Sequence, residues 1–183
     1  YIQRGLSTVS GMSYGFYENH GRVKTEGFNV SARYSWSRWI SIGGTFNNIN
    51  VRDNERYVAG NTLQESATYG QRMPNLPYMF ANFDATFTWH GLFAGGNVLT
   101  VIYDGYYQHE FPLYWERFGD PASKSTVPEQ LSHNLSIGYS IQNGRYNISI
   151  ECRNLTDAKL YDNFSLQKAG RAFYLKLRVY FGS

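Results

Sequence analysis

Residues 171–181 read Arg171-Ala172-Phe173-Tyr174-Leu175-Lys176-Leu177-Arg178-Val179-Tyr180-Phe181. Apolar and polar residues alternate along this stretch without a break. One face holds Phe173, Leu175, Leu177, Val179 and Phe181, and the other holds Ala172, Tyr174, Lys176, Arg178 and Tyr180. Strict period two predicts a β-strand with one apolar face. The length matches the roughly 9 to 11 residues with which a tilted strand crosses a bilayer.

The same alternation recurs upstream. It covers residues 28–36, 40–46, 79–89, 99–107, 131–141 and 146–153. The segment from Tyr1 to Tyr17 also reads as a strand, although Gly5, Gly11 and Gly15 interrupt it. The residues Gln142-Asn143-Gly144-Arg145 form a tight-hairpin signal between two of the runs. The sequence therefore predicts about eight antiparallel strands and no helix.

The connections between these strands alternate in length. Short ones fall near Trp36, His90 and Asn143, whereas long ones run from Arg52 to Pro77 and from His109 to Glu129. Short turns at one end and long loops at the other are typical of outer-membrane barrels, whose long loops lie outside the cell. Aromatic residues near the strand ends fit interfacial girdles, although ordinary β-propensity also enriches them. We predict an all-β, transmembrane antiparallel β-barrel rather than a soluble β-domain.

Composition excludes several other classes. No stretch approaches the roughly 20 apolar residues of a membrane-spanning helix. The net charge is only +3 and the basic residues are dispersed, which argues against a nucleic-acid partner. The chain begins at Tyr1 without a signal-peptide pattern, so we expect mature or internal sequence.

No catalytic constellation is visible. The single cysteine, Cys152, can form neither an intrachain disulfide nor a zinc cluster. The four histidines are isolated in sequence and lack the spacing of a metal site. We therefore expect no enzyme activity, no metal and no cofactor.

Three parts of the chain resemble TonB-dependent receptors. Glu18–Asn29 is similar to a stretch that links two late barrel strands of that family, and Arg72–Tyr78 to a segment that enters a following strand. Glu151–Asp157 and Tyr161–Phe164, followed by Gly170–Tyr174, resemble the closing hairpin of the barrel.

The resemblance implies a 22-stranded barrel in the outer membrane of a Gram-negative bacterium, with residues 1–183 as the C-terminal third. The plug domain and the TonB-contacting segment have no counterpart in this chain. The implied function is active import of a large, scarce nutrient: an iron chelate, haem, cobalamin or an oligosaccharide. The implied partners are outer-membrane lipid, the plug and remaining strands, TonB, the ligand and, as in some family members, a surface lipoprotein.

Two sets of residues are candidates for the site. Polar residues expected to face the lumen, where structural ion pairs compete with direct ligand contacts, are Arg33, Glu151, Arg153, Lys176 and Arg178. Loop residues whose rings and guanidinium group suit sugars, chelates or haem are Tyr57, Tyr69, Tyr107, His109, Tyr114, Trp115 and Arg117. The loop aromatics fit an interfacial girdle equally well.

Two alternatives remain open from sequence. Eight strands can close into a small barrel with an anchoring role, but such an interior must be filled with side chains. Ser132, Ser136, Gly138 and Ser140 are small and favour a wider barrel. An outer-membrane hydrolase would require a histidine and a carboxylate in the loops.

Overall fold

The computed structural model describes residues 2–9, 12–19, 21–58, 61–115, 125–163 and 165–181. For residues 2–9, 12–19, 58 and 61 it describes the backbone alone. Within these ranges every regular element is a β-strand. The described part holds no helix long and apolar enough to cross a membrane.

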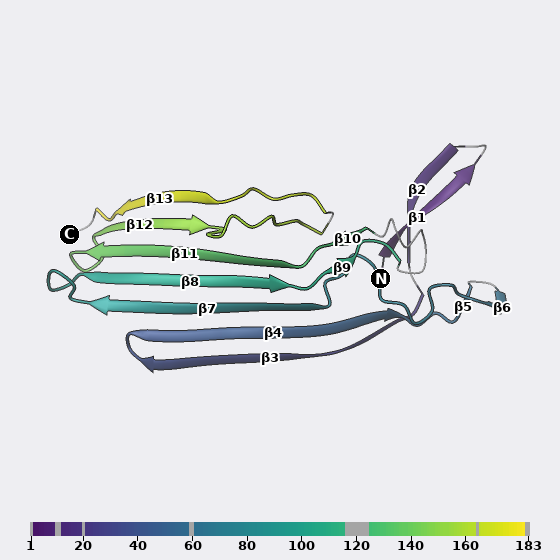
Figure 1. The fold of residues 1–183 in the computed structure, drawn as a ribbon, viewed down its shortest axis with the longest axis horizontal. Coiled ribbons are helices and arrows are strands. Elements are labelled where there is room, and N and C mark those ends of the chain that lie inside the picture. The colour runs from purple at the N-terminus through teal and green to yellow at the C-terminus, as the bar shows by residue number, and fades with distance from the viewer. Residues whose placement is uncertain are drawn as a thin grey trace.

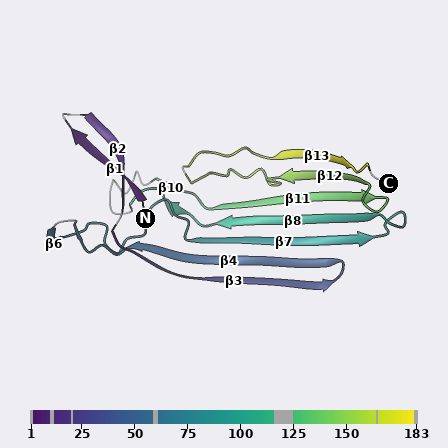
Figure 2. The same ribbon diagram turned by 180° about the vertical axis from the view of Figure 1, so that it is seen from behind.

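Seven strands form one antiparallel sheet in the order β13-β12-β11-β8-β7-β4-β3 (Figures 1 and 2). The strands are β3 (Val23–Ser37), β4 (Ile40–Asp53), β7 (Met79–His90), β8 (Val98–Gln108), β11 (Gln130–Ile141), β12 (Tyr146–Arg153) and β13 (Ala172–Val179). Each corresponds to one of the runs in which apolar and polar residues alternate, so the all-β, antiparallel prediction is confirmed. The central strands are about as long as a bilayer crossing requires.

The pattern underestimated the first hairpin of this sheet. β3 begins at Val23 rather than Phe28, and β4 continues to Asp53 rather than Phe46. The extension is held by backbone pairing, which continues to Val23↔Asp53. Ladder hydrogen bonds do not require an alternating side-chain pattern, so the alternation marked only the part with an apolar face.

The N-terminal segment forms two strands rather than one. β1 (Ile2–Val9) and β2 (Met12–Asn19) pair antiparallel, with a register that runs from Ile2↔Asn19 to Val9↔Met12. This hairpin is a separate two-stranded sheet, as are β5 (Tyr57–Val58) with β6 (Asn61–Glu65) and β9 (Phe111–Pro112) with β10 (Thr126–Val127).

The main sheet is open. Among the described residues no pairing joins β13 to β3, and β1 and β2 pair only with each other. These residues therefore do not form the closed eight-stranded barrel. Each edge strand of the described sheet therefore has one neighbour within it.

The two ends of the sheet differ as expected. Short turns at 38–39, 91–97 and 142–145 lie at the end where the C-terminus is found, and the long connections lie at the opposite end (Figure 1). In the 142–145 turn, Gln142, Asn143 and Gly144 have positive φ angles of 52°, 54° and 94°. Asparagine and glycine tolerate this left-handed region well, which explains the tight reversal.

Pairing register gives the sheet one apolar and one polar face. One row across the apolar face consists of Tyr34, Ile42, Ala85, Tyr103, Leu135, Cys152 and Phe173. The apolar face is exposed: Val30 is 57% exposed, Leu175 63% and Leu177 70%. Soluble proteins rarely leave so continuous an apolar surface in water, so this face requires lipid.

No central hydrophobic core accompanies the sheet in the described residues. The buried hydrophobic side chains there are Met73, Phe111, Val127 and Cys152, and the first three lie at the base of the long connections. Phe111 and Val127 face each other across β9 and β10. Packing therefore fixes the loop bases, whereas the sheet itself depends on its backbone ladder and its surroundings.

Candidate functional site

The polar face carries a row of charged and amide side chains across the sheet. Register places Arg33, Gly43, Asp84, Asp104 and Asn134 side by side on β3, β4, β7, β8 and β11. Glu151, Arg153 and Lys176 continue it on β12 and β13 through their side-chain contacts. We call these eight residues the polar belt.

The first contact of the polar belt spans two strands. Arg33 Nη2 lies 2.8 Å from Asp84 Oδ1, although β4 runs between them. The residue of β4 at this point is Gly43, and a Cβ there would lie 2.7 Å from Arg33 Nη2 and 2.9 Å from Asp84 Oδ1. Glycine is therefore needed because the guanidinium group crosses the space of its missing side chain.

Asp84 and Asp104 are direct cross-strand partners. Like charges in this position repel each other. Arg33 neutralises Asp84, and Asn134 Nδ2 donates a hydrogen bond of 2.7 Å to Asp104 Oδ2. The direct partner of the Asp104 carboxylate is thus an amide, whereas that of Asp84 is a cation.

Glu151 is shared by two cations. Arg153 Nε lies 2.6 Å from its Oε1, and Lys176 Nζ lies 2.5 Å from its Oε2. The guanidinium group of Arg153 also stacks on the Tyr174 ring, 5.0 Å from its centroid. A carboxylate whose two oxygens each bind one cation holds both cations in place over β12 and β13.

The structure places all five polar residues predicted for the lumen on the polar face. Four of them belong to the polar belt, whereas Arg178 lies at the short-turn end, with its Nη1 3.3 Å from Tyr180 Oη. That this face lines a lumen stays a prediction. Asp84, Asp104 and Asn134 were not among the predicted site residues, although alternation assigns Asp84 and Asn134 to the polar faces of their strands.

The loop candidates divide into separate clusters. Tyr107 Oη lies 3.2 Å from His109 Nδ1 and donates a 3.2 Å hydrogen bond to Glu129 Oε2. His109 contacts the Tyr78 ring edge to face, at a centroid distance of 5.5 Å. Tyr107 pairs with Ala81 and Leu131, so it lies on the apolar face and fits the girdle interpretation better than ligand contact.

Arg72 contacts both the other end of the Arg72–Tyr78 segment and strand β4. Its guanidinium group lies 3.8 Å from the centroid of the Tyr78 ring, and its Nε donates a 3.2 Å hydrogen bond to Asn50 Oδ1. The next residue, Met73, is buried and donates its backbone N–H to Val51. The segment therefore fastens the long connection onto the end of β4.

A second cluster surrounds Arg56. Its guanidinium group lies over the Tyr57 ring at 5.5 Å and 3.1 Å from Glu65 Oε1. The hydrogen bond with Glu65 raises the pKa of Arg56 above its ordinary value, and the nearby Tyr57 and Tyr69 hydroxyls contribute in the same direction. Tyr57 and Tyr69 are 37% and 46% exposed, so this cluster presents rings and a cation to solvent.

The remaining candidates lie in the second long connection. Tyr114 is 70% exposed and Trp115 follows it, while Arg117 lies outside the described residues. Within the described ranges no group of histidine, cysteine and carboxylate side chains is arranged to hold a metal ion.

Residues 1–155 match the model of the β-barrel of TonB-dependent receptor-like proteins. The chain belongs to the TonB-dependent receptor family. This family consists of outer-membrane receptors of Gram-negative bacteria, and its barrel accounts for the apolar outer face described above.

Comparison with solved structures finds the same fold. The siderophore receptor PiuA from Acinetobacter baumannii superimposes with a TM-score of 0.62 at 19% sequence identity. The match covers 88% of this chain and 22% of that receptor, so the chain spans about a fifth of its relative. A comparison with curated proteins gives no significant match.

Proposed function

We propose that this chain supplies the C-terminal strands and extracellular loops of a TonB-dependent receptor that imports a large, scarce nutrient across the outer membrane. The ligand is an iron chelate, haem, cobalamin or an oligosaccharide. The observation that carries the proposal is a bilayer-length sheet with one continuous, exposed apolar face and a charged belt on the other. A sheet of this kind separates lipid from an aqueous channel.

In this proposal residues 1–183 form the last third of a 22-stranded barrel. The unpaired edges of β3 and β13 support it, since they leave both sides of the sheet ready to continue into further strands. The plug and the segment that contacts TonB come from outside this chain. A surface lipoprotein is a further partner of the proposed receptor.

The polar belt suits an interior through which a plug must move. It holds three cations, Arg33, Arg153 and Lys176, and three anions, Asp84, Asp104 and Glu151, so its formal charge is zero. Two of the anions already have cationic partners within the belt. When a plug moves along this surface, few charges of the belt are therefore left without a partner. Unpaired charges away from water would cost free energy.

The loops are the proposed ligand-binding part. The exposed rings of Tyr57, Tyr69 and Tyr114, with Arg56, can stack on sugars or planar chelates. TonB then transmits energy from the inner membrane to release the plug and admit the ligand.

Uptake measurements test this function. Cells that carry or lack the gene, and cells that lack TonB, are supplied in turn with radiolabelled ferric chelates, haem, cobalamin and oligosaccharides. We expect uptake of one ligand class to be lost in both deletion strains and restored by the gene in the presence of TonB. Unchanged uptake of every ligand in the receptor deletion, or import that continues without TonB, would contradict the proposal.

A further inference from the structure

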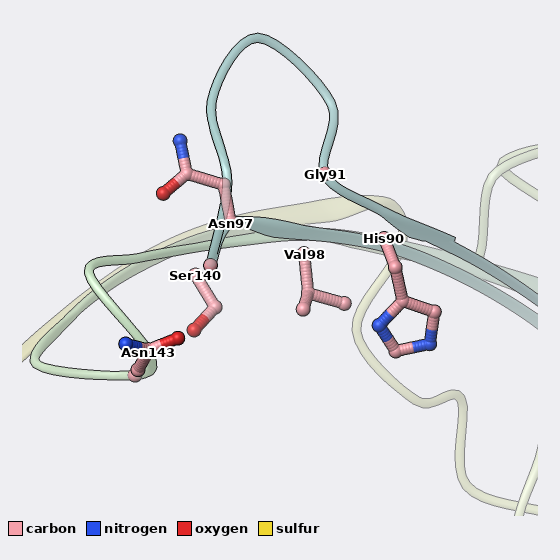
Figure 3. Close-up of a pocket in the computed structure, with 8 residues that line it drawn as sticks. His90, Gly91, Asn97, Val98, Ser140 and Asn143 are labelled. Carbon is pink, nitrogen blue, oxygen red and sulfur yellow. The ribbon is translucent and has the colours of Figure 1, made fainter.

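Two cavities adjoin at the short-turn end of the polar face. One has a volume of about 430 Å³ and is lined by His90, Val98, Ser140 and the 143–144 turn, as Figure 3 shows. The other has a volume of about 690 Å³ and extends to Asn147, Arg178 and Tyr180. Both are lined by Asn143 and Gly144, so they adjoin at this turn, and we call the two together the rim trough.

The walls of the rim trough are fixed by contacts between neighbouring turns. Asn143 donates its backbone N–H to the Gly96 carbonyl at 2.9 Å, and Gln142 donates its own to Asn97 Oδ1 at 3.2 Å. Asn97 Nδ2 in turn donates to Tyr139 Oη at 2.8 Å. A binding surface held in this way loses little conformational freedom when it is occupied.

The rim trough is one-sided in charge. Arg145, Arg178 and His90 line it, and among its described lining residues there is no aspartate or glutamate. This contrasts with the polar belt, whose cations are paired with carboxylates. Side chains with guanidinium groups and no local counter-charge favour a carboxylate-bearing ligand.

Most of the trough lies on the polar face of the sheet. Ser140, Asn147 and Arg178 are register partners in one row of the polar face, on the opposite side from the lipid-facing residues. The trough crosses β7, β8, β11, β12 and β13, which are four strand spacings or about 19 Å wide, the span of about five to six extended residues. Tyr180 and Phe181, 55% and 91% exposed, add an apolar wall at its far end.

We propose that the rim trough binds an extended acidic peptide segment, in which carboxylates meet Arg178, Arg145 and His90 and apolar side chains meet the aromatic wall. This proposal adds a peptide partner to the proposed transport function. It rests on that function only in one respect, the side of the membrane from which the peptide reaches the trough. Charge complementarity and the width of the trough both select an extended peptide over a small anion.

Fluorescence anisotropy of the full-length protein in detergent tests the site. The probes are a fluorescein-labelled hexapeptide of alternating glutamate and valine and its glutamine–valine counterpart. At low salt we expect the glutamate peptide to bind at least about tenfold more tightly, and Arg178→Gln to remove about tenfold of that affinity. Arg178→Lys, which keeps the charge, retains most of it.

Arg38→Gln is the matched control, since Arg38 lies in another short turn at the same end and outside the trough. It should leave peptide binding unchanged. Equal affinity for the two peptides, equal losses at Arg38 and Arg178, or displacement of the peptide by an equal concentration of inorganic phosphate would overturn the proposal. Binding is measured without transport, so these results are independent of the uptake experiment.

Discussion

Replacing Ile137 with lysine places a charge in the middle of the apolar face. Ile137 lies on β11 between Val101 of β8 and Ile150 of β12, and it is 44% exposed in the sheet alone. Ser136, the preceding residue, lies on the polar face between Ile102 and Glu151. Lysine at position 136 is therefore a matched control with the same charge, the same strand and the opposite face.

The expected loss in the free energy of unfolding follows from the depth of position 137 in the bilayer. Ile137 lies four residues from Ile141, the end of β11, which is about 13 Å along the strand and about 9 Å in depth after a tilt of about 45°. The apolar band of such barrels is about 25 Å tall, so this position is close to the midplane. A lysine there costs about 2 to 4 kcal/mol, or about 30- to 900-fold in the unfolding equilibrium.

The assay is urea unfolding of the full-length protein from lipid vesicles, followed by tryptophan fluorescence. We expect Ile137→Lys to lower the free energy of unfolding by the amount above, and Ser136→Lys to change it by less than about 1 kcal/mol, because its face is wet and Glu151 lies opposite. Similar losses for both variants, or a larger loss for Ser136→Lys, would refute the assignment of the two faces.

Further predictions concern the polar belt and a turn. Gly43→Ala should cost about 1 to 3 kcal/mol in urea unfolding, because the new Cβ meets the Arg33 guanidinium group, and Arg33→Ala should recover most of that loss; an additive double mutant would contradict this reason. Asp84→Asn should destabilise more than Asp104→Asn, by about 0.5 to 1 kcal/mol, because the direct partner of Asp84 is a cation and that of Asp104 is an amide, and either change relieves the repulsion; the reverse order would show the pairing to be wrong. Tyr139→Phe removes two hydrogen bonds to the 91–97 connection, so amide exchange there should accelerate by about fivefold or more, whereas unchanged exchange would mean that these bonds contribute nothing.

Hairpins and faces could be read from the sequence because both depend on local chemistry. Period two assigns each side chain to a face, so Lys176 and Arg178 were placed opposite Leu175 and Leu177 before any register was known. The asparagine and glycine between residues 142 and 145 marked the tight turn for the same reason. The N-terminal hairpin was missed because the glycines in residues 1–17 were interpreted as interruptions of a single strand.

The candidate site was only partly predictable. The five polar residues were found individually, but the partners of Arg33 and Glu151 depend on which strands are neighbours and on their register. The loop candidates were chosen by residue type, and residue type does not say that Tyr107 belongs to the apolar face.

By itself, the sequence determined a set of antiparallel strands with one face for lipid and one for water, because alternation acts residue by residue. Only the tertiary structure decided that Arg33 passes over Gly43 to Asp84 and that two turns enclose the rim trough. These contacts join strands far apart in the chain. A shift of one residue in the pairing of the strands that form a contact would move its side chains to opposite faces and break that contact.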